Sequence, residues 1–141
     1  MTPLEALQAT LAGEHAAVYV YGVLGGRVSV SKQPTLAGDL TRAYTTHRGR
    51  RDQLVAMVRA AGGEPVASDV SYELPNPSRT TRQLTAGALV IEERSAEGYA
   101  AMVGATSRAN RQWAIDALED TAVRQLAFGA GTDDFPGVSE L

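Results

Sequence analysis

The amino-acid sequence predicts an all-α protein, a four-helix bundle in which one long crossover joins the second and third helices. Apolar residues recur every three or four positions in four stretches, the spacing that places side chains on one face of a helix. A long proline-rich segment separates the second stretch from the third. The strand-like run Val28-Ser29-Val30 has no second alternating run to pair with, so we expect it to be a loop.

The first helix is expected to begin at Thr2 and to end at Gly25-Gly26. Thr2 can cap the helix, Pro3 suits its first position, and Glu5 completes a capping box. Glu14 falls in register with the apolar face near the helix midpoint, where an unpaired charge would be too costly to bury. The apolar face itself consists of Leu4, Leu7, Leu11, Val18 and Tyr21.

The second helix is expected to start between Pro34 and Asp39 and to end at Gly62-Gly63. His47 occupies a core-facing position near its middle and is followed by the basic run Arg48 to Arg51. Because Asp52 follows that run and the chain is acidic overall, we expect a solvated helix face with one arginine turned inward.

The third helix is expected to start between Ser78 and Thr81 and to run to about Thr106, with Glu92 bordering its apolar stripe near the midpoint. The turn at Ser107 is very short, so the fourth helix, from Arg108 to about Phe128, must run antiparallel to the third. Glu119 again falls near a midpoint, on a face whose expected inward residues are Trp113, Ile115, Leu118, Ala122 and Leu126.

The connector over residues 62–78 is long enough to travel the length of a helix. Helices of about 20 residues are ~30 Å long, and an extended chain covers ~3.3 Å per residue. The second and third helices can therefore be parallel. A bundle with one long crossover has ferritin-like topology, whereas an up-down bundle would need only short turns.

The midpoints of four bundled helices lie at one level, so the chain should contain a polar core layer. Three carboxylates and one imidazole at one level can hold a metal, but they can also be paired with arginine, from Arg50 or Arg51. We expect this layer to comprise Glu14, His47, Arg51, Glu92 and Glu119.

The ligand set for a dinuclear metal centre is incomplete. Such a centre takes one Glu from each of two helices and Glu-x-x-His from each of the other two. The second helix offers Tyr44-Thr-Thr-His47, and the fourth offers Asp116-Ala-Leu-Glu119 without a histidine. His15 is next to Glu14 and so lies about 100° round the helix. We therefore expect a charge-paired layer with no metal, no cofactor and no catalytic residue.

The composition of the chain indicates its domain number and argues against some classes of partner and location. The chain has 141 residues, 44% of them hydrophobic, and is expected to form one domain over residues 1–141 with a C-terminal tail from residue 128. The net charge of −3 argues against a nucleic-acid partner. The sequence has no cysteine, no signal-peptide pattern and no apolar run long enough for a membrane, so a cytoplasmic protein is expected.

Several stretches resemble an uncharacterised ferritin-like domain family found mainly in actinobacteria. The resemblance covers nearly the whole chain and rests on residues 13–22, residues 44–52, Ala114-Ile-Asp116-Ala-Leu118 and Phe135-Pro-Gly137. It implies a four-helix bundle with no assigned biochemical activity. Iron storage or tRNA hydroxylation would follow from analogy of fold alone, which is weak support for a function.

The sequence therefore favours a non-enzymatic interaction or binding module, with a homodimer, another protein or a small ligand as candidate partners. The alternative is a divergent metal-binding oxidoreductase of the ferritin-like superfamily. It would hold iron or another transition metal with Glu14, His47 and Glu92, and with Glu119 as a further candidate ligand.

Overall fold

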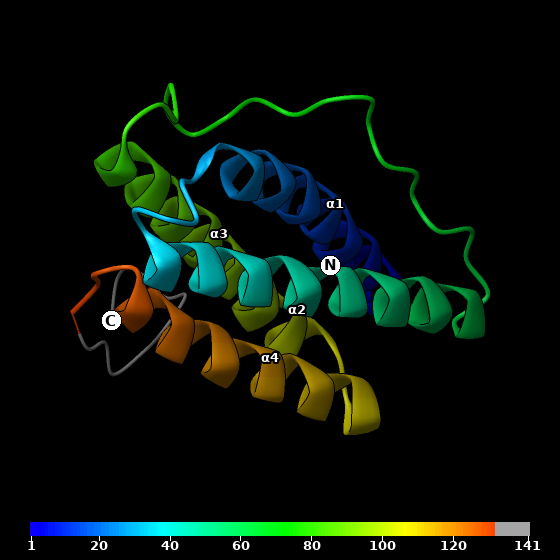
Figure 1. The fold of residues 1–141 in the computed structure, drawn as a ribbon. Coiled ribbons are helices and arrows are strands. Elements are labelled where there is room, and N and C mark those ends of the chain that lie inside the picture. Colours follow the sequence, from blue (N-terminus) through cyan, green and yellow to red (C-terminus); the bar gives the residue numbers. More distant parts are fainter. Residues whose placement is uncertain (132–141) are drawn as a thin grey trace.

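The computed structural model describes residues 1–131, and within them it consists of helices joined by loops (Figure 1). The helices are α1 (Pro3–Arg27), α2 (Pro34–Ala60), α3 (Thr81–Ala105) and α4 (Arg108–Ala127). The run Val28 to Val30 lies in the loop between α1 and α2, as the sequence predicted. No helix in the described part of the chain is long and apolar enough to cross a membrane.

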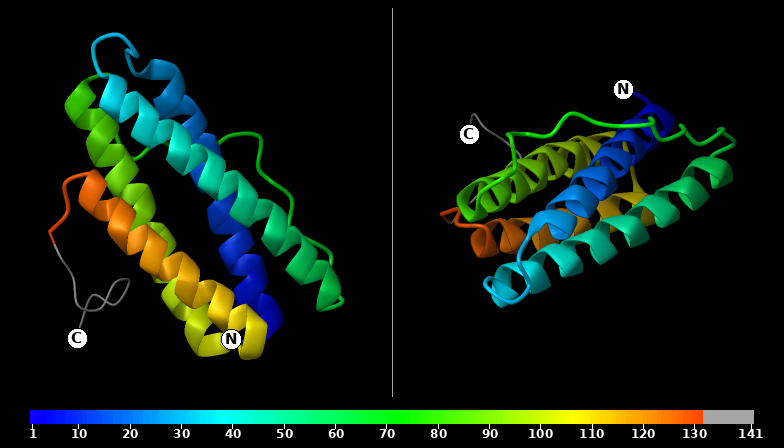
Figure 2. Two further views of the ribbon diagram at one scale, coloured as in Figure 1. Left: turned by 60° about the horizontal axis from the view of Figure 1, so that its bottom comes forward. Right: turned by 45° about the horizontal axis from the view of Figure 1, so that its top comes forward.

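The order and direction of the helices confirm the predicted topology. α1 and α2 run antiparallel, α2 and α3 run parallel, and α4 returns antiparallel to α3 (Figures 1 and 2). The connector between α2 and α3 crosses the length of the bundle over the outer side of α1. α1 packs against both α2 and α3, α3 also packs against α4, and α2 contacts α4 much less. The fold is therefore a ferritin-like four-helix bundle.

Two helix starts carry complete capping boxes. At α1, the Thr2 hydroxyl accepts from the Glu5 amide while the Glu5 carboxylate accepts from the Thr2 amide. Thr80 and Gln83 make the same reciprocal pair at the start of α3. These pairs satisfy backbone donors that the first turn of a helix leaves free, so local sequence fixes where both helices begin.

The connector is held to α1 by polar contacts. The Gln8 side chain donates to the carbonyl of Glu64 and accepts from the amide of Val66. The His15 ring nitrogen Nε2 lies 2.9 Å from the Val66 carbonyl oxygen. These bonds pair backbone groups of a segment that has no secondary structure of its own.

The core consists of two apolar clusters with a polar layer between them. One cluster, at the end of the bundle that holds the α1–α2 loop, contains Ala17, Val20, Tyr21, Leu24, Leu40, Ala43, Leu84, Ala88, Ile91 and Phe128. The other, at the opposite end, contains Leu7, Leu11, Leu54, Val58, Met102 and Ala114. Phe128, at the predicted junction of the fourth helix and the tail, is buried in the first cluster; Phe135 lies outside the described residues.

Candidate functional site

His47 lies at the centre of the polar layer and contacts a carboxylate on each side. Its Nδ1 is 2.6 Å from Glu14 Oε2, and its Nε2 is 2.9 Å from Glu92 Oε1. The three side chains come from α2, α1 and α3, and each is at most 2% exposed. The structure therefore brings together three of the residues that the sequence placed in the layer.

The contacts of His47 determine its protonation. Burial alone would lower the pKa of its imidazole, but the negative charges of Glu14 and Glu92 and their hydrogen bonds outweigh burial and raise that pKa to about 9. At neutral pH both ring nitrogens therefore carry a proton and donate to carboxylates. The layer holds an imidazolium between two glutamates.

Two tyrosines provide further hydrogen bonds to the same carboxylates. The Tyr99 hydroxyl donates to Glu14 Oε1, and the Tyr21 hydroxyl donates to Glu92 Oε1 at 2.6 Å. Burial and the adjacent glutamate charge both raise the pKa of each phenol, so the tyrosines stay neutral donors. The Tyr21 ring also stacks on the His47 ring, with centroids 5.3 Å apart.

These tyrosines form a reciprocal pattern between α1 and α3. Tyr21 follows Glu14 by seven residues, and Tyr99 follows Glu92 by seven. Because seven residues are about two helical turns, each tyrosine lies on the same face as its own glutamate. The two helices are antiparallel, so each tyrosine reaches the glutamate of the other helix.

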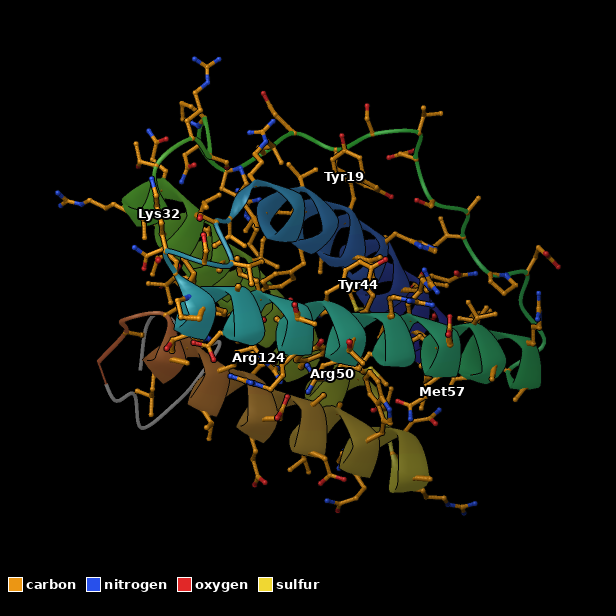
Figure 3. All side chains as sticks on the ribbon, in the orientation of Figure 1. Tyr19, Lys32, Tyr44, Arg50, Met57 and Arg124 are labelled. Carbon is orange, nitrogen blue, oxygen red and sulfur yellow. The ribbon has the colours of Figure 1, made fainter. Side chains whose placement is uncertain are left out.

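Arg50 extends the layer from α2 to α4. Its guanidinium donates to the Tyr99 hydroxyl at 3.2 Å, to Thr121 Oγ1 at 3.0 Å and to Asp120 Oδ2 at 2.5 Å. It also lies over the Tyr99 ring, 5.1 Å from the centroid. Figure 3 shows Arg50 reaching from α2 into the space beside α4. The Arg50 side chain is only 9% exposed, whereas its ion-pair partner Asp120 is 48% exposed and lies at the edge of the bundle.

Arg124 reaches into the same space from α4 (Figure 3). It donates to Asp120 Oδ2 at 2.7 Å and to Thr46 Oγ1 at 3.3 Å, and its Nη1 is 3.9 Å from Glu92 Oε2. That Glu92 oxygen is buried and has no hydrogen-bond partner within residues 1–131. Three acids and three bases make the layer electrically neutral: Glu14, Glu92 and Asp120 with His47, Arg50 and Arg124.

Two residues predicted for the layer lie outside it. Arg51 points away from the core, 28% exposed, and pairs with its neighbour Asp52 at 2.9 Å, because one residue turns a helix by about 100°. Arg50 is the inward arginine instead; its position three residues after His47 places it on the same helix face. Glu119 is exposed, and its neighbour Asp120 takes part in the layer.

The predicted inward face of α4 was wrong, which explains why Glu119 is exposed and lies outside the layer. The buried residues of α4 are Ala114, Ala117 and Thr121. The larger Ile115 and Leu118 are only partly buried. The inward face of α4 thus consists of small residues, and one of them, Thr121, accepts a hydrogen bond from Arg50. A prediction that takes the largest apolar residues as the core misses such a face. None of the five residues that were expected to face inward is fully buried: Trp113, Ile115, Leu118, Ala122 and Leu126.

The donors present do not fit a dinuclear carboxylate centre. Nδ1 and Nε2 point away from each other across the imidazole, so Glu14 and Glu92 lie on opposite sides of His47 and the three do not converge on one point. Of the two Glu-x-x-His pairs such a centre needs, α2 has Tyr44 in place of the glutamate. Within residues 1–131 no group of three or more His, Cys, Asp or Glu side chains is arranged to hold a metal ion.

Comparison with known proteins identifies the relatives of this chain. Residues 6–140 match the family described as "Domain of unknown function (DUF4439)". No curated protein matches the sequence significantly.

The solved structures that this chain resembles include the following two. A conserved hypothetical protein, rv2844, from Mycobacterium tuberculosis aligns with a TM-score of 0.82 and 28% identity, over 89% of this chain and 93% of that one. A protein from Bacillus anthracis str. Ames, whose structure is described as that of ferritin like, diiron-carboxylate proteins, aligns with a TM-score of 0.75 and 18% identity, over 89% and 91%. The second likeness, at this identity, supports the fold alone.

Proposed function

This chain belongs to the family described as Domain of unknown function (DUF4439), and we propose that it is a non-catalytic binding module built on a ferritin-like bundle. The polar layer is structural in this proposal and holds no dinuclear metal. The observation that carries it is the position of His47, whose two ring nitrogens each meet a carboxylate. A histidine binds a metal through an unprotonated nitrogen, so an imidazolium between two glutamates has no ligand position to offer.

The arginines support the same role. Arg50 and Arg124 bring two fixed positive charges to the level at which a ferritin-like centre would hold its metal ions. With His47 they balance the three carboxylates, so a divalent ion would add uncompensated charge in a buried site. The buried pairs of His47 with Glu14 and Glu92, completed by Tyr21 and Tyr99, favour one arrangement of the helices that carry them.

Metal analysis tests this proposal. Protein purified without chelator should contain far less than one equivalent of any transition metal, measured by inductively coupled plasma mass spectrometry. Dialysis against a chelator should leave its melting temperature unchanged, because no metal contributes to the fold.

The competing oxidoreductase function makes the opposite prediction. Stoichiometric iron, together with oxygen consumption on addition of ferrous iron that His47→Ala abolishes, would overturn the proposal. The matched control is His15→Ala, which removes a histidine that contacts the connector and lies outside the layer.

The partner is proposed to be either a second copy of the chain or a small ligand. Two large apolar side chains on the outside of α4, Val123 at 68% and Leu126 at 45%, are the observation that favours a homodimer. Light scattering over a range of concentrations should show a dimer that Val123→Ser weakens. A monomer at every concentration would remove the dimer from the proposal and leave the small ligand.

A further inference from the structure

A cavity of about 160 Å³ lies between α1 and α3, beside the polar layer. Glu14 and Tyr99, both buried members of the layer, form its inner end. Its walls are mostly small or apolar, and Ile91 is the largest apolar side chain among them. Arg94 also lines the cavity and is exposed, so it lies at the rim. We call this space the α1–α3 cavity.

The cavity exists because glycines face it from both helices. Gly13 on α1 and Gly98 on α3 line the space, and a Cβ atom added at either would meet no atom within 4 Å. Both glycines lie inside helices, where glycine is less favourable than alanine. Neither has a positive φ that would require glycine, so the backbone does not explain their presence. Their effect is to leave the cavity open.

The inner end of the cavity can accept further hydrogen bonds. Within residues 1–131, each oxygen of the Glu14 carboxylate accepts one side-chain hydrogen bond, from His47 or from Tyr99. A carboxylate has about four acceptor positions, so Glu14 retains capacity for a donor that enters from the cavity. Glu14 is 2% exposed, so such a donor would be held away from bulk water.

The rim of the cavity carries a positive charge, whereas the inner end carries a negative one. Arg94 forms no ion pair with any other described residue. Its guanidinium can bind a carboxylate in a bidentate manner. The cavity therefore has a hydrogen-bond acceptor at its inner end, an apolar middle and a cation at its mouth. A ligand with a donor at one end and an anion at the other would bind in one orientation.

We propose that the α1–α3 cavity binds a small organic acid with a body of about six carbon atoms and a hydroxyl group opposite its carboxylate. The hydroxyl donates to Glu14, the body packs against Ile91 and the glycines, and the carboxylate pairs with Arg94. The size follows from the volume, because a cavity of ~150 Å³ holds a molecule as large as benzene. This inference rests on the proposed role as a binding module and names its ligand class.

Isothermal titration calorimetry of the full chain with 4-hydroxybenzoate tests the proposal. Two analogues each lack one feature: benzoate has no hydroxyl, and 4-hydroxybenzyl alcohol has no carboxylate. Binding of 4-hydroxybenzoate should be about tenfold or more tighter than that of either analogue, since each loses one charge-assisted hydrogen bond. Equal affinities for the three compounds, or no binding of 4-hydroxybenzoate, would overturn the proposal.

Variants locate the site. Gly98→Leu should fill the cavity and abolish binding, and Arg94→Gln should weaken binding of 4-hydroxybenzoate about tenfold without affecting 4-hydroxybenzyl alcohol. The matched control is Gly104→Leu, at another α3 glycine where an added Cβ meets no atom within 4 Å and which does not line the cavity.

Each variant should melt at or above the wild-type temperature, since Gly98 and Gly104 are helical glycines and Arg94 is exposed. Wild-type affinity in folded Gly98→Leu would place the site elsewhere and refute the assignment. Failure of this experiment leaves the metal analysis untouched, so a wrong ligand class and a wrong role for the polar layer can be told apart.

Discussion

Raising the pH should destabilise the bundle through His47. The pKa of its imidazole is about 9 in the folded chain, because Glu14 and Glu92 overcome the effect of burial. An unperturbed histidine has a pKa of about 6.5. Since folding raises this pKa, the stabilisation is fully present below about pH 6.5 and is lost as the pH rises through about 9.

The size of the effect follows from the two pKa values. A change from about 6.5 to about 9, at about 1.4 kcal/mol per pKa unit, corresponds to about 3 kcal/mol of folding free energy. That is a large share of the ~5–15 kcal/mol that stabilises an ordinary domain.

The assay is urea unfolding followed by circular dichroism at several pH values between about 6.5 and about 9.5, for the wild type and for His47→Gln. The wild type should lose about 3 kcal/mol across this range. The glutamine variant should start lower and stay nearly constant, because glutamine does not titrate. A wild-type stability that is flat, or that falls by the same amount in the variant, would refute the imidazolium. Stability that rises with pH would instead indicate a metal bound to neutral His47.

Three further predictions concern the layer and the helix ends. Arg50→Leu should lower the free energy of unfolding by about 2 kcal/mol, because it removes buried hydrogen bonds, whereas Arg51→Leu should change it by less than about 0.5 kcal/mol. Equal losses for the two variants in urea titrations would contradict the assigned positions of the two arginines. Thr80→Ala should cost about 1 kcal/mol by removing a capping box, and an unchanged melting temperature would show that this cap contributes little. Burial alone would raise the pKa of Glu92, but hydrogen bonds from His47 and Tyr21 lower it. Thermal melts should therefore show stability falling below about pH 4.5, and Glu92→Gln should reduce that acid dependence.

The sequence predicted the fold well because its strongest signals are local. Thr2 with Glu5 marks the start of α1, and the period of the apolar residues identifies all four helices. The crossover followed from a single comparison of the length of the connector with the length of a helix. Glu14, His47 and Glu92 could be singled out because each is polar on or beside an apolar face.

The remaining members of the layer depend on which atoms meet across the bundle. Arg50 and Arg51 are adjacent in the sequence, and only their angular position around the helix relative to His47 shows which of them faces inward. On α4 the inward face consists of small residues, so the partly buried Ile115 suggested the wrong register. The tyrosines could have been found from the repeated Glu-x6-Tyr spacing of α1 and α3, but their exchange of partners needs the antiparallel packing as well.

The protonation of His47 tests the central claim most directly. Nitrogen-15 nuclear magnetic resonance of the labelled protein reports each ring nitrogen, and His15 provides an internal comparison. We expect both nitrogens of His47 to remain protonated through neutral pH up to about 9, with chemical shifts that ferrous iron or zinc leaves unchanged. A neutral His47 at pH 7, or resonances that shift or broaden on addition of one equivalent of metal, would contradict a metal-free, charge-paired layer.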